Sequence, residues 1–174
     1  MKLAVIYHSE SGNTKQAAEW IAEGMARVEG VEAKAMSIGE IDEAFVKESA
    51  GVVIGSPTYA ASMTAQMRSW LQDSAKALGM GGKLGGAFAT EQYTHGGGDL
   101  VVQSILTIEM VFGMLCYSGG ASKGRPVIHL GPVGVNRNQE PHNGMENYRG
   151  YFGLYGERFA AKAAELFMQK SLNV

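Results

Sequence analysis

Residues 8–14, which read HSESGNT, decide the fold of this chain. An apolar run precedes them at residues 3–7, and a segment with apolar residues three and four positions apart follows at 14–28. These patterns predict a strand and then a helix, joined by a hydroxyl-rich turn. Hydroxyl groups beside the unpaired N–H groups of a helix N-terminus suit a phosphate dianion, and Gly12 lets the backbone come close. The same residues also suit a capped turn without a ligand, because Ser, Asn and Thr are common N-cap residues.

The rest of the chain repeats the alternation of strand and helix. We expect strands at residues 31–36, 51–55, 84–90, 114–117 and 126–130, and helices at 64–78, 99–112 and 148–170. Residues 37–49 have a weak helical pattern, and loops are expected at 56–59, 91–98 and 131–147. The uninterrupted apolar run at 51–55 is typical of a strand that is buried on both faces. The pattern predicts an α/β sandwich with a central parallel sheet.

Length and charge limit the classes of function. The 174 residues suit one domain, 1–174, and the net charge of −2 provides no basic excess for a nucleic acid or an anionic membrane. No apolar run approaches the roughly 18 residues of a membrane span, and we expect no signal peptide, so a cytoplasmic protein is the default. The single cysteine, Cys116, lies in an apolar run and is expected in the core. One cysteine also excludes an internal disulfide and a cysteine-rich metal site.

Three loops follow the ends of predicted strands, at residues 8–14, 56–63 and 90–98. All three are rich in small, hydroxyl-bearing or glycine residues. In a parallel sheet of this kind, ligands bind beyond the carboxyl ends of the strands. The convergence of the three loops therefore favours a mononucleotide cofactor over a turn without a ligand.

Three motifs in these loops carry a family resemblance. They are SESGNT at residues 9–14, GSPT at 55–58 followed by MTAQMR at 63–68, and the loop after Phe88 that ends in the glycines 96–98. Over about residues 2–168 the chain resembles the flavodoxin-like FMN proteins. Within them it is similar to the WrbA-type NAD(P)H:quinone oxidoreductases and their shorter relatives. Ala60 and Ala61 depart from the aromatic-glycine pair of the WrbA pattern.

The resemblance implies a fold and a cofactor site. The fold is a three-layer sandwich whose five-stranded parallel sheet has the order 2-1-3-4-5. The cofactor is FMN, its phosphate on the first loop and its ring between the second and third, and no metal is implied. The implied cofactor-binding residues are Ser9, Glu10, Ser11, Gly12, Asn13, Thr14, Pro57, Thr58, Tyr59, Ala60, Ala61, Ser62, Thr90, Glu91, Gln92, Tyr93, Gly97 and Gly98.

Five side chains in and beside these loops invite particular hypotheses. Tyr59 and Tyr93 would either stack on the flavin or simply cover the core. Tyr93 and His95 are the candidate catalytic residues. For His95 the reason is that an imidazole exchanges protons near neutral pH, and a solvent-facing loop histidine is at least as good an interpretation. A structural role is favoured for His8. Glu10 would oppose a phosphate, so we expect its side chain to point to solvent and only its N–H to serve the site.

The favoured function is an FMN-dependent oxidoreductase that passes electrons from NAD(P)H through flavin N5 to a quinone-like acceptor. The resemblance also implies a homo-oligomer, a dimer or tetramer. The alternative is a flavodoxin-type electron carrier that docks on redox proteins and turns over no substrate itself. Such carriers are usually strongly acidic, and a net charge of −2 offers little long-range steering. A third hypothesis is a phosphate-binding or interaction domain that has lost the flavin.

Overall fold

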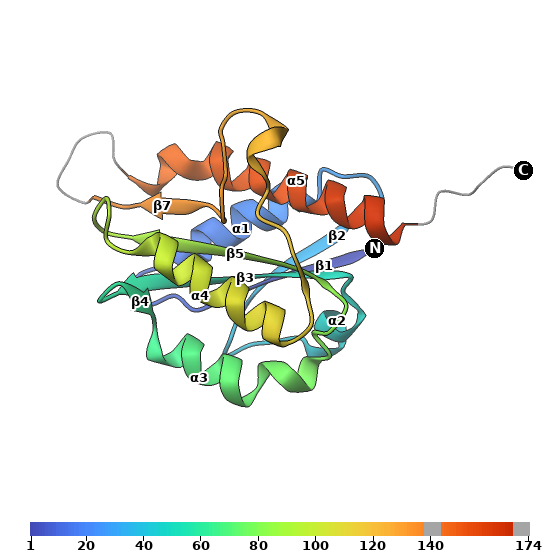
Figure 1. Ribbon diagram of the computed structural model, residues 1–174. Coiled ribbons are helices and arrows are strands. Elements are labelled where there is room, and N and C mark those ends of the chain that lie inside the picture. Colours follow the sequence, from blue (N-terminus) through green and yellow to red (C-terminus); the bar gives the residue numbers. More distant parts are fainter. Residues whose placement is uncertain (138–143, 169–174) are drawn as a thin grey trace, which may run out of the picture.

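A sheet of seven strands lies between two layers of helices in the computed structural model of the chain, which describes residues 1–137 and 144–168 (Figure 1). Five strands follow one another in the order β2-β1-β3-β5-β6, and their neighbours pair in parallel. They are β1 Lys2–Tyr7, β2 Glu32–Ser37, β3 Gly51–Tyr59, β5 Leu84–Glu91 and β6 Leu115–Cys116. The expected α/β sandwich with strand order 2-1-3-4-5 is thus confirmed. The strands beyond five are β4 Ser62–Met63, antiparallel to β3, and β7 Val133–Val135, parallel to β5.

Helices cover both faces of the sheet (Figure 1). One face carries α1 Asn13–Met25 and α5 Arg149–Phe167, and the other carries α2 Glu43–Glu48, α3 Ala65–Asp73 and α4 Gly98–Val111. Successive residues of β1 alternate between the two cores: Leu3 and Val5 pack under α1 and α5, whereas Ala4 and Ile6 pack under the other layer. Both faces are buried, so the strand reads as a continuous apolar run.

Close approach of α1 and α5 depends on glycines. A Cβ atom on Gly24 would collide with the carbonyl oxygen of Gly153, and one on Gly156 would collide with that of Ile21. The two helices therefore pack backbone against backbone. This contact fixes the position of α1, and with it the turn at residues 8–12 that begins the candidate site.

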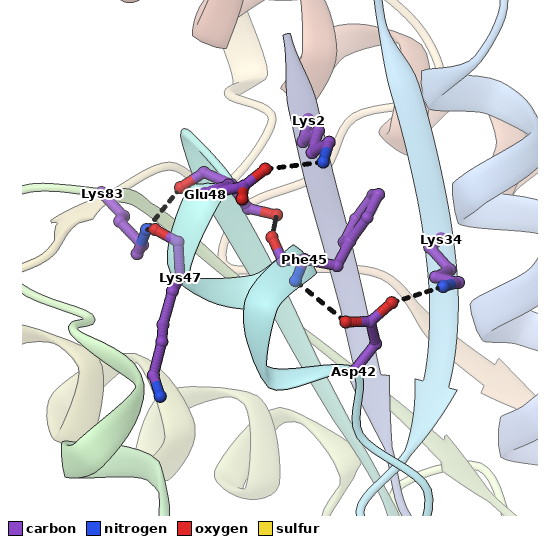
Figure 2. Close-up of polar contacts among 8 residues, drawn as sticks. Lys2, Lys34, Asp42, Phe45, Lys47, Glu48 and Lys83 are labelled. Carbon is purple, nitrogen blue, oxygen red and sulfur yellow. Dashed lines mark hydrogen bonds and ion pairs between the residues drawn. The ribbon is translucent and has the colours of Figure 1, made fainter.

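The short helix α2 forms where only a weak helical pattern was predicted (Figure 2). Its N-cap, Asp42, accepts from the N–H of Phe45 at 3.0 Å and pairs with Lys34 of β2 at 2.8 Å. At its other end, Lys83 donates to the carbonyl oxygens of Lys47 and Ser49. Caps at both ends supply the backbone partners that so short a helix lacks, which stabilises it where propensity alone would not.

Several helix boundaries differ from the predicted ranges. Residues 64–78 form α3 only to Asp73 and continue as a 3₁₀ turn, Ala75–Leu78. The first helix ends at Met25 rather than 28. The last helix begins at Arg149 and ends at Phe167, and its predicted end at residue 170 lies outside the described residues. Further 3₁₀ turns cover Ala121–Lys123 and Met145–Tyr148.

The prediction of a strand at residues 126–130 is wrong. Within this run only Ile128 is buried, in the core under α1 and α5, whereas Val127 and Leu130 are exposed. The side chain of Arg158 donates to the carbonyl oxygens of Pro126 and Lys123, which gives this segment partners other than a neighbouring strand. The strand β7 forms instead at Val133–Val135, within the predicted loop 131–147.

β6 and β7 together occupy the same edge of the sheet. β6 pairs with the beginning of β5, at Leu84 and Gly85, and β7 pairs with its end, from Ala89 to Glu91. The chain leaves the edge after Cys116 and returns to it at Val133. The last position of the sheet is therefore filled by two short pieces rather than by one strand.

The prediction that Cys116 lies in the core is also wrong. The residue is exposed, because β6 is a two-residue strand at the edge of the sheet. Its thiol turns inward, however, and lies 3.7 Å from the carboxyl of Glu109 on α4. Burial, together with the charge and hydrogen bond of Glu109, raises the pKa of Cys116 to about 12. This pKa makes the thiolate, the nucleophilic form, scarce at neutral pH.

Glu109 is a fully buried acid that the sequence analysis did not single out. Its Oε1 atom has no hydrogen-bond partner among the described residues. Burial raises the pKa of Glu109 well above the usual range of a carboxyl group, against the smaller opposing effects of hydrogen bonds from Cys116 and Gly86. The folded protein therefore holds a proton here that the unfolded chain releases near its ordinary pKa.

We expect Glu109→Gln to reduce the pH dependence of stability. Above the unfolded pKa the folded state binds one more proton than the unfolded state, so this group makes stability fall as pH rises towards its folded pKa. The variant lacks the titration, and its stability relative to wild type should grow by up to about 1.4 kcal/mol per pH unit. Urea unfolding of both proteins at pH 5, 6 and 7 measures this difference, and a constant difference would contradict the assignment.

Candidate functional site

The carboxyl ends of β1, β3 and β5 lead into three loops that surround a cavity of about 570 Å³. Its lining residues are Ser11, Asn13, Pro57, Thr58, Tyr59, Ala60, Ala61, Thr90, Glu91, Gln92, Tyr93, Gly96 and Asn136. All of these except Gly96 and Asn136 belong to the site predicted from the sequence. The structure thus brings the three predicted loops together at one edge of the sheet, with a volume within the ordinary range for small-molecule sites.

Seven other predicted residues lie in or beside these loops without lining the cavity. They are Ser9, Glu10, Gly12, Thr14, Ser62, Gly97 and Gly98. Some of them bond to residues that do line it, such as Thr14 to Thr90 and Gly98 to Glu91. Gly12 has φ of +92°, a conformation that favours glycine, and its N–H donates to Ser9 Oγ at 3.1 Å.

The start of α1 presents the features of an anion site. No described side chain caps the helix, and its first turn contains no acidic residue. The Asn13 amide donates to Ser11 Oγ at 3.2 Å, so the side chains of this turn bond to one another. The N–H groups of the first turn and the positive end of the helix dipole are left to favour a negative ligand.

Two hydrogen bonds join this first loop to distant parts of the chain. Thr14 is buried, and its hydroxyl lies 2.8 Å from that of Thr90 at the end of β5. Asn136, which follows β7, donates its amide to Asn13 Oδ1 at 2.9 Å. Sequence reasoning missed Asn136, since it falls in a segment predicted as loop. The alternation of Val133, Gly134 and Val135 before it hints at a short strand but does not show where that strand pairs.

The second loop is the tip of a β-hairpin rather than the loop expected at residues 56–59. β3 continues through these residues and pairs with β4, with Tyr59 opposite Ser62. Ala60 and Ala61 form the two-residue connection, and their φ angles are +48° and +58°. Positive φ at both positions is the hallmark of a type I′ turn, where Asn and Gly are preferred. Two alanines there store backbone strain at the rim of the cavity.

Thr58 has an unused hydroxyl. Its Oγ1 atom is buried and finds no hydrogen-bond partner among the described residues, although Thr58 lines the cavity. A buried polar atom without a partner costs about 1–3 kcal/mol. The hydroxyl is thus a polar group of a lining residue that the described part of the protein leaves unsatisfied.

The third loop is shaped by close contacts of its glycines. A Cβ on Gly97 would lie 2.6 Å from Ala61 Cα, and one on Gly98 would lie 2.5 Å from a methyl carbon of Val133. The N–H of Gly98, at the start of α4, donates to Glu91 Oε2 at 2.7 Å. Glu91 thereby places its carboxylate at a helix N-terminus, where the dipole favours negative charge.

The candidate tyrosines and histidines occupy different positions. Tyr59 and Tyr93 line the cavity and are 49% and 64% exposed, so neither ring is buried over the core. Their stacking on a cofactor stays a prediction. His95 is not among the lining residues, whereas Tyr93 is. His8 Nδ1 lies 3.0 Å from the hydroxyl of Thr64, the N-cap of α3, in keeping with the structural role expected of it.

Glu10 is exposed but does not simply point to solvent. Its Oε2 accepts from the hydroxyl of Tyr59 at 3.3 Å, and its Oε1 accepts from the amide of Gln66 at 3.4 Å. Burial, and then the charge and hydrogen bond of Glu10, raise the pKa of Tyr59. The carboxylate is thus directed to the second loop and α3, away from the anion site.

Clusters of metal-ligating side chains and membrane-spanning helices are both absent from the part of the chain that the structure describes. In residues 1–137 and 144–168, no three His, Cys, Asp or Glu side chains gather as a metal site would require. Within the same part of the chain, no helix has the length and apolar character needed to cross a membrane.

Comparison with known proteins places the chain in a family. The family model described as "Flavodoxin" matches residues 5–97. A flavodoxin from Clostridium saccharobutylicum is 40% identical over 167 residues, which cover 96% of this chain and 100% of that protein. This chain belongs to the flavodoxin family. A flavodoxin from Aquifex aeolicus is 33% identical, over 80% of this chain and 78% of the relative.

More distant matches include enzymes. An NAD(P)H dehydrogenase (quinone) from Chromohalobacter salexigens is 28% identical, over 65% of this chain and 68% of the relative. Among solved structures, an archaeal flavodoxin superposes with a TM-score of 0.72 at 23% identity, over 94% of this chain and 99% of that one. A WrbA-like protein from Agrobacterium tumefaciens superposes with a TM-score of 0.70 at 24% identity, over 94% of this chain and 98% of that one. At these identities the two structures support the fold alone.

The prediction that the chain is an NAD(P)H:quinone oxidoreductase is wrong. The relatives matched at the higher identities and over most of their length are flavodoxins, which are electron carriers, and the quinone dehydrogenases are more distant. The resemblance to the flavodoxin-like FMN proteins, with their WrbA-type relatives, is confirmed. The weak net charge, which favoured an enzyme, does not decide between an enzyme and an electron carrier. The predicted dimer or tetramer stays a prediction.

We expect Ala60→Gly to stabilise the protein by about 0.5–1 kcal/mol, because glycine adopts positive φ without the steric cost that alanine has. Chemical unfolding of the protein without added ligand measures the change. Ala65→Gly is the matched control: this alanine is exposed at the start of α3, and glycine there should destabilise by up to about 1 kcal/mol. A loss of stability in Ala60→Gly would show that the turn is not strained.

Proposed function

We propose that the protein is an FMN-binding electron carrier that exchanges electrons with partner redox proteins and turns over no substrate of its own. Membership of the flavodoxin family supports this function, as does the arrangement of the cavity. FMN, when bound, supplies a centre that accepts and releases electrons. The chain's own residues would bind and orient it, with residues 1–174 acting as a single FMN-binding domain.

The observation that carries the proposal is the match between the cavity and the two ends of FMN. At one end, α1 presents an uncapped N-terminus without acidic residues in its first turn, which suits the phosphate. At the other end, Thr58 lines the cavity, and its buried hydroxyl has no hydrogen-bond partner among the described residues. The exposed rings of Tyr59 and Tyr93 flank the same cavity.

The predicted cofactor residues divide between binding and support under this proposal. Ser11 and Asn13 line the phosphate end, and residues 57–61 and 90–93 line the ring end. Thr14 supports the site from behind through its bond to Thr90. The carboxylate of Glu91 accepts from the N–H of Gly98 at the start of α4. The dipole of α4 therefore offsets the charge of Glu91, which would otherwise stand free beside the flavin ring.

Thr58→Val should have opposite effects on the protein with and without FMN. Valine has the same shape but no hydroxyl, so the variant without cofactor should be more stable by about 1 kcal/mol. If the hydroxyl bonds to FMN, the dissociation constant should rise by about tenfold. Urea unfolding and titration of the apoprotein by quenching of flavin fluorescence measure the two effects.

Thr107→Val provides the matched control, since Thr107 lies on α4 with its hydroxyl bonded to Gln103 and does not line the cavity. It should leave the affinity for FMN unchanged. An unaltered affinity for FMN in Thr58→Val would show that the hydroxyl of Thr58 does not bond to FMN. A wild-type protein that binds no FMN would refute the proposed function.

The carrier should not accept electrons directly from nicotinamides. Holoprotein mixed anaerobically with NADPH or NADH should keep the absorbance of its oxidised flavin for minutes, and dithionite should bleach it at once. Adding a catalytic amount of a flavodoxin reductase with NADPH should then bleach it as well. Bleaching within seconds by NADPH alone would contradict the carrier function.

A further inference from the structure

An acidic residue in the turn that receives a phosphate requires an explanation. Glu10 lies between Ser9 and Ser11, and a carboxylate beside a phosphate dianion would repel it. The structure directs this side chain elsewhere. One oxygen accepts from the Tyr59 hydroxyl and the other from the Gln66 amide, so the carboxylate is held from two elements at once.

Tyr59 stands between two cavities. It lines the larger cavity of about 570 Å³ and also a neighbouring one of about 360 Å³, whose other lining residues are Glu10, Met63, Thr64, Ala65 and Gln66. The ring is half exposed and lies immediately before the strained turn at Ala60 and Ala61. Glu10 lines only the smaller cavity, so it meets Tyr59 on the side away from the cofactor site.

We propose that Glu10 is a positioning residue for the flavin. Its carboxylate holds the hydroxyl of Tyr59, so that the tyrosine ring remains part of the wall of the larger cavity. Without this hydrogen bond the ring is free to turn into the smaller cavity, and the larger one loses an aromatic surface. Gln66 completes the arrangement by fixing the other carboxylate oxygen from α3. The inference rests on the proposed function, because it names the residue that orients one part of the FMN site.

Three variants and a double variant test the proposal through binding. Glu10→Ala removes the acceptor, and Tyr59→Phe removes the donor but keeps the ring. Each should raise the dissociation constant of oxidised FMN by about three- to tenfold, because each breaks the same charged hydrogen bond. The double variant should lose no more than either single one, since the two residues act through one contact. Glu10→Gln keeps an acceptor and should restore most of the affinity.

A spectroscopic readout separates positioning from a general loss of structure. A tyrosine ring held against the flavin quenches its fluorescence, so bound FMN should fluoresce more strongly in Glu10→Ala than in wild type. Glu19→Ala is the matched control: it removes one acidic side chain from the exposed face of α1, paired only loosely with Lys15 at 3.9 Å. It should leave both the affinity and the fluorescence unchanged.

The contact between Glu10 and Tyr59 is also measurable without any flavin. In the apoprotein, tyrosines labelled with carbon-13 at Cζ can be titrated and followed by NMR. The pKa of Tyr59 should be lower in Glu10→Ala than in wild type, because the Glu10 carboxylate contributes to raising this pKa. An unchanged Tyr59 titration, or losses of FMN affinity that add in the double variant, would overturn the inference. Failure of the wild-type protein to bind FMN would instead overturn the proposed function, and the apoprotein titration would still report on the contact.

Discussion

The candidate site depends on one buried hydrogen bond, between the hydroxyls of Thr14 and Thr90. Thr14 belongs to the first turn of α1, and Thr90 lies near the end of β5, on the far side of β3 in the sheet. Both side chains are almost fully buried, so neither hydroxyl can exchange its partner for water without cost. The bond thus fixes the distance between the anion site at α1 and the loop that follows β5. The glycine contacts between α1 and α5 hold the helix from the other side.

Much of the fold could be predicted from the sequence, because the strongest patterns are short-range. The apolar runs at residues 3–7 and 51–55 and the helical spacing after Thr14 each reflect burial on identifiable faces. The wrong predictions concern apolar residues that do not form a buried strand. Ile128 anchors an irregular segment rather than a strand, and Cys116 sits at an exposed edge with only its thiol turned inward. An apolar run of five residues has the same sequence pattern whether one side chain of it is buried or the whole run forms a buried strand.

The site could be predicted at the level of loops but not of individual contacts. Most of the cavity lining falls in the three predicted loops, since the carboxyl ends of parallel strands must share an edge. Asn136 could not be found, because its role depends on β7 returning to that edge. The direction of Glu10 was likewise invisible, since Tyr59 is 49 positions away in the chain. Net charge was a poor guide to function because it governs how partners are steered, not whether a cofactor site turns over a substrate.

The division of the sheet edge between β6 and β7 has a consequence for how this chain can vary. Sixteen residues, 117–132, leave the edge and re-enter it beside the same strand. Both attachment points are fixed by pairing with β5, so the exposed part of the excursion can change in length without shifting the register of any neighbouring strand, as long as Ile128 keeps its place in the core. New sequence can therefore be grafted at this place during evolution, or by an engineer, while the geometry of the cavity is inherited intact.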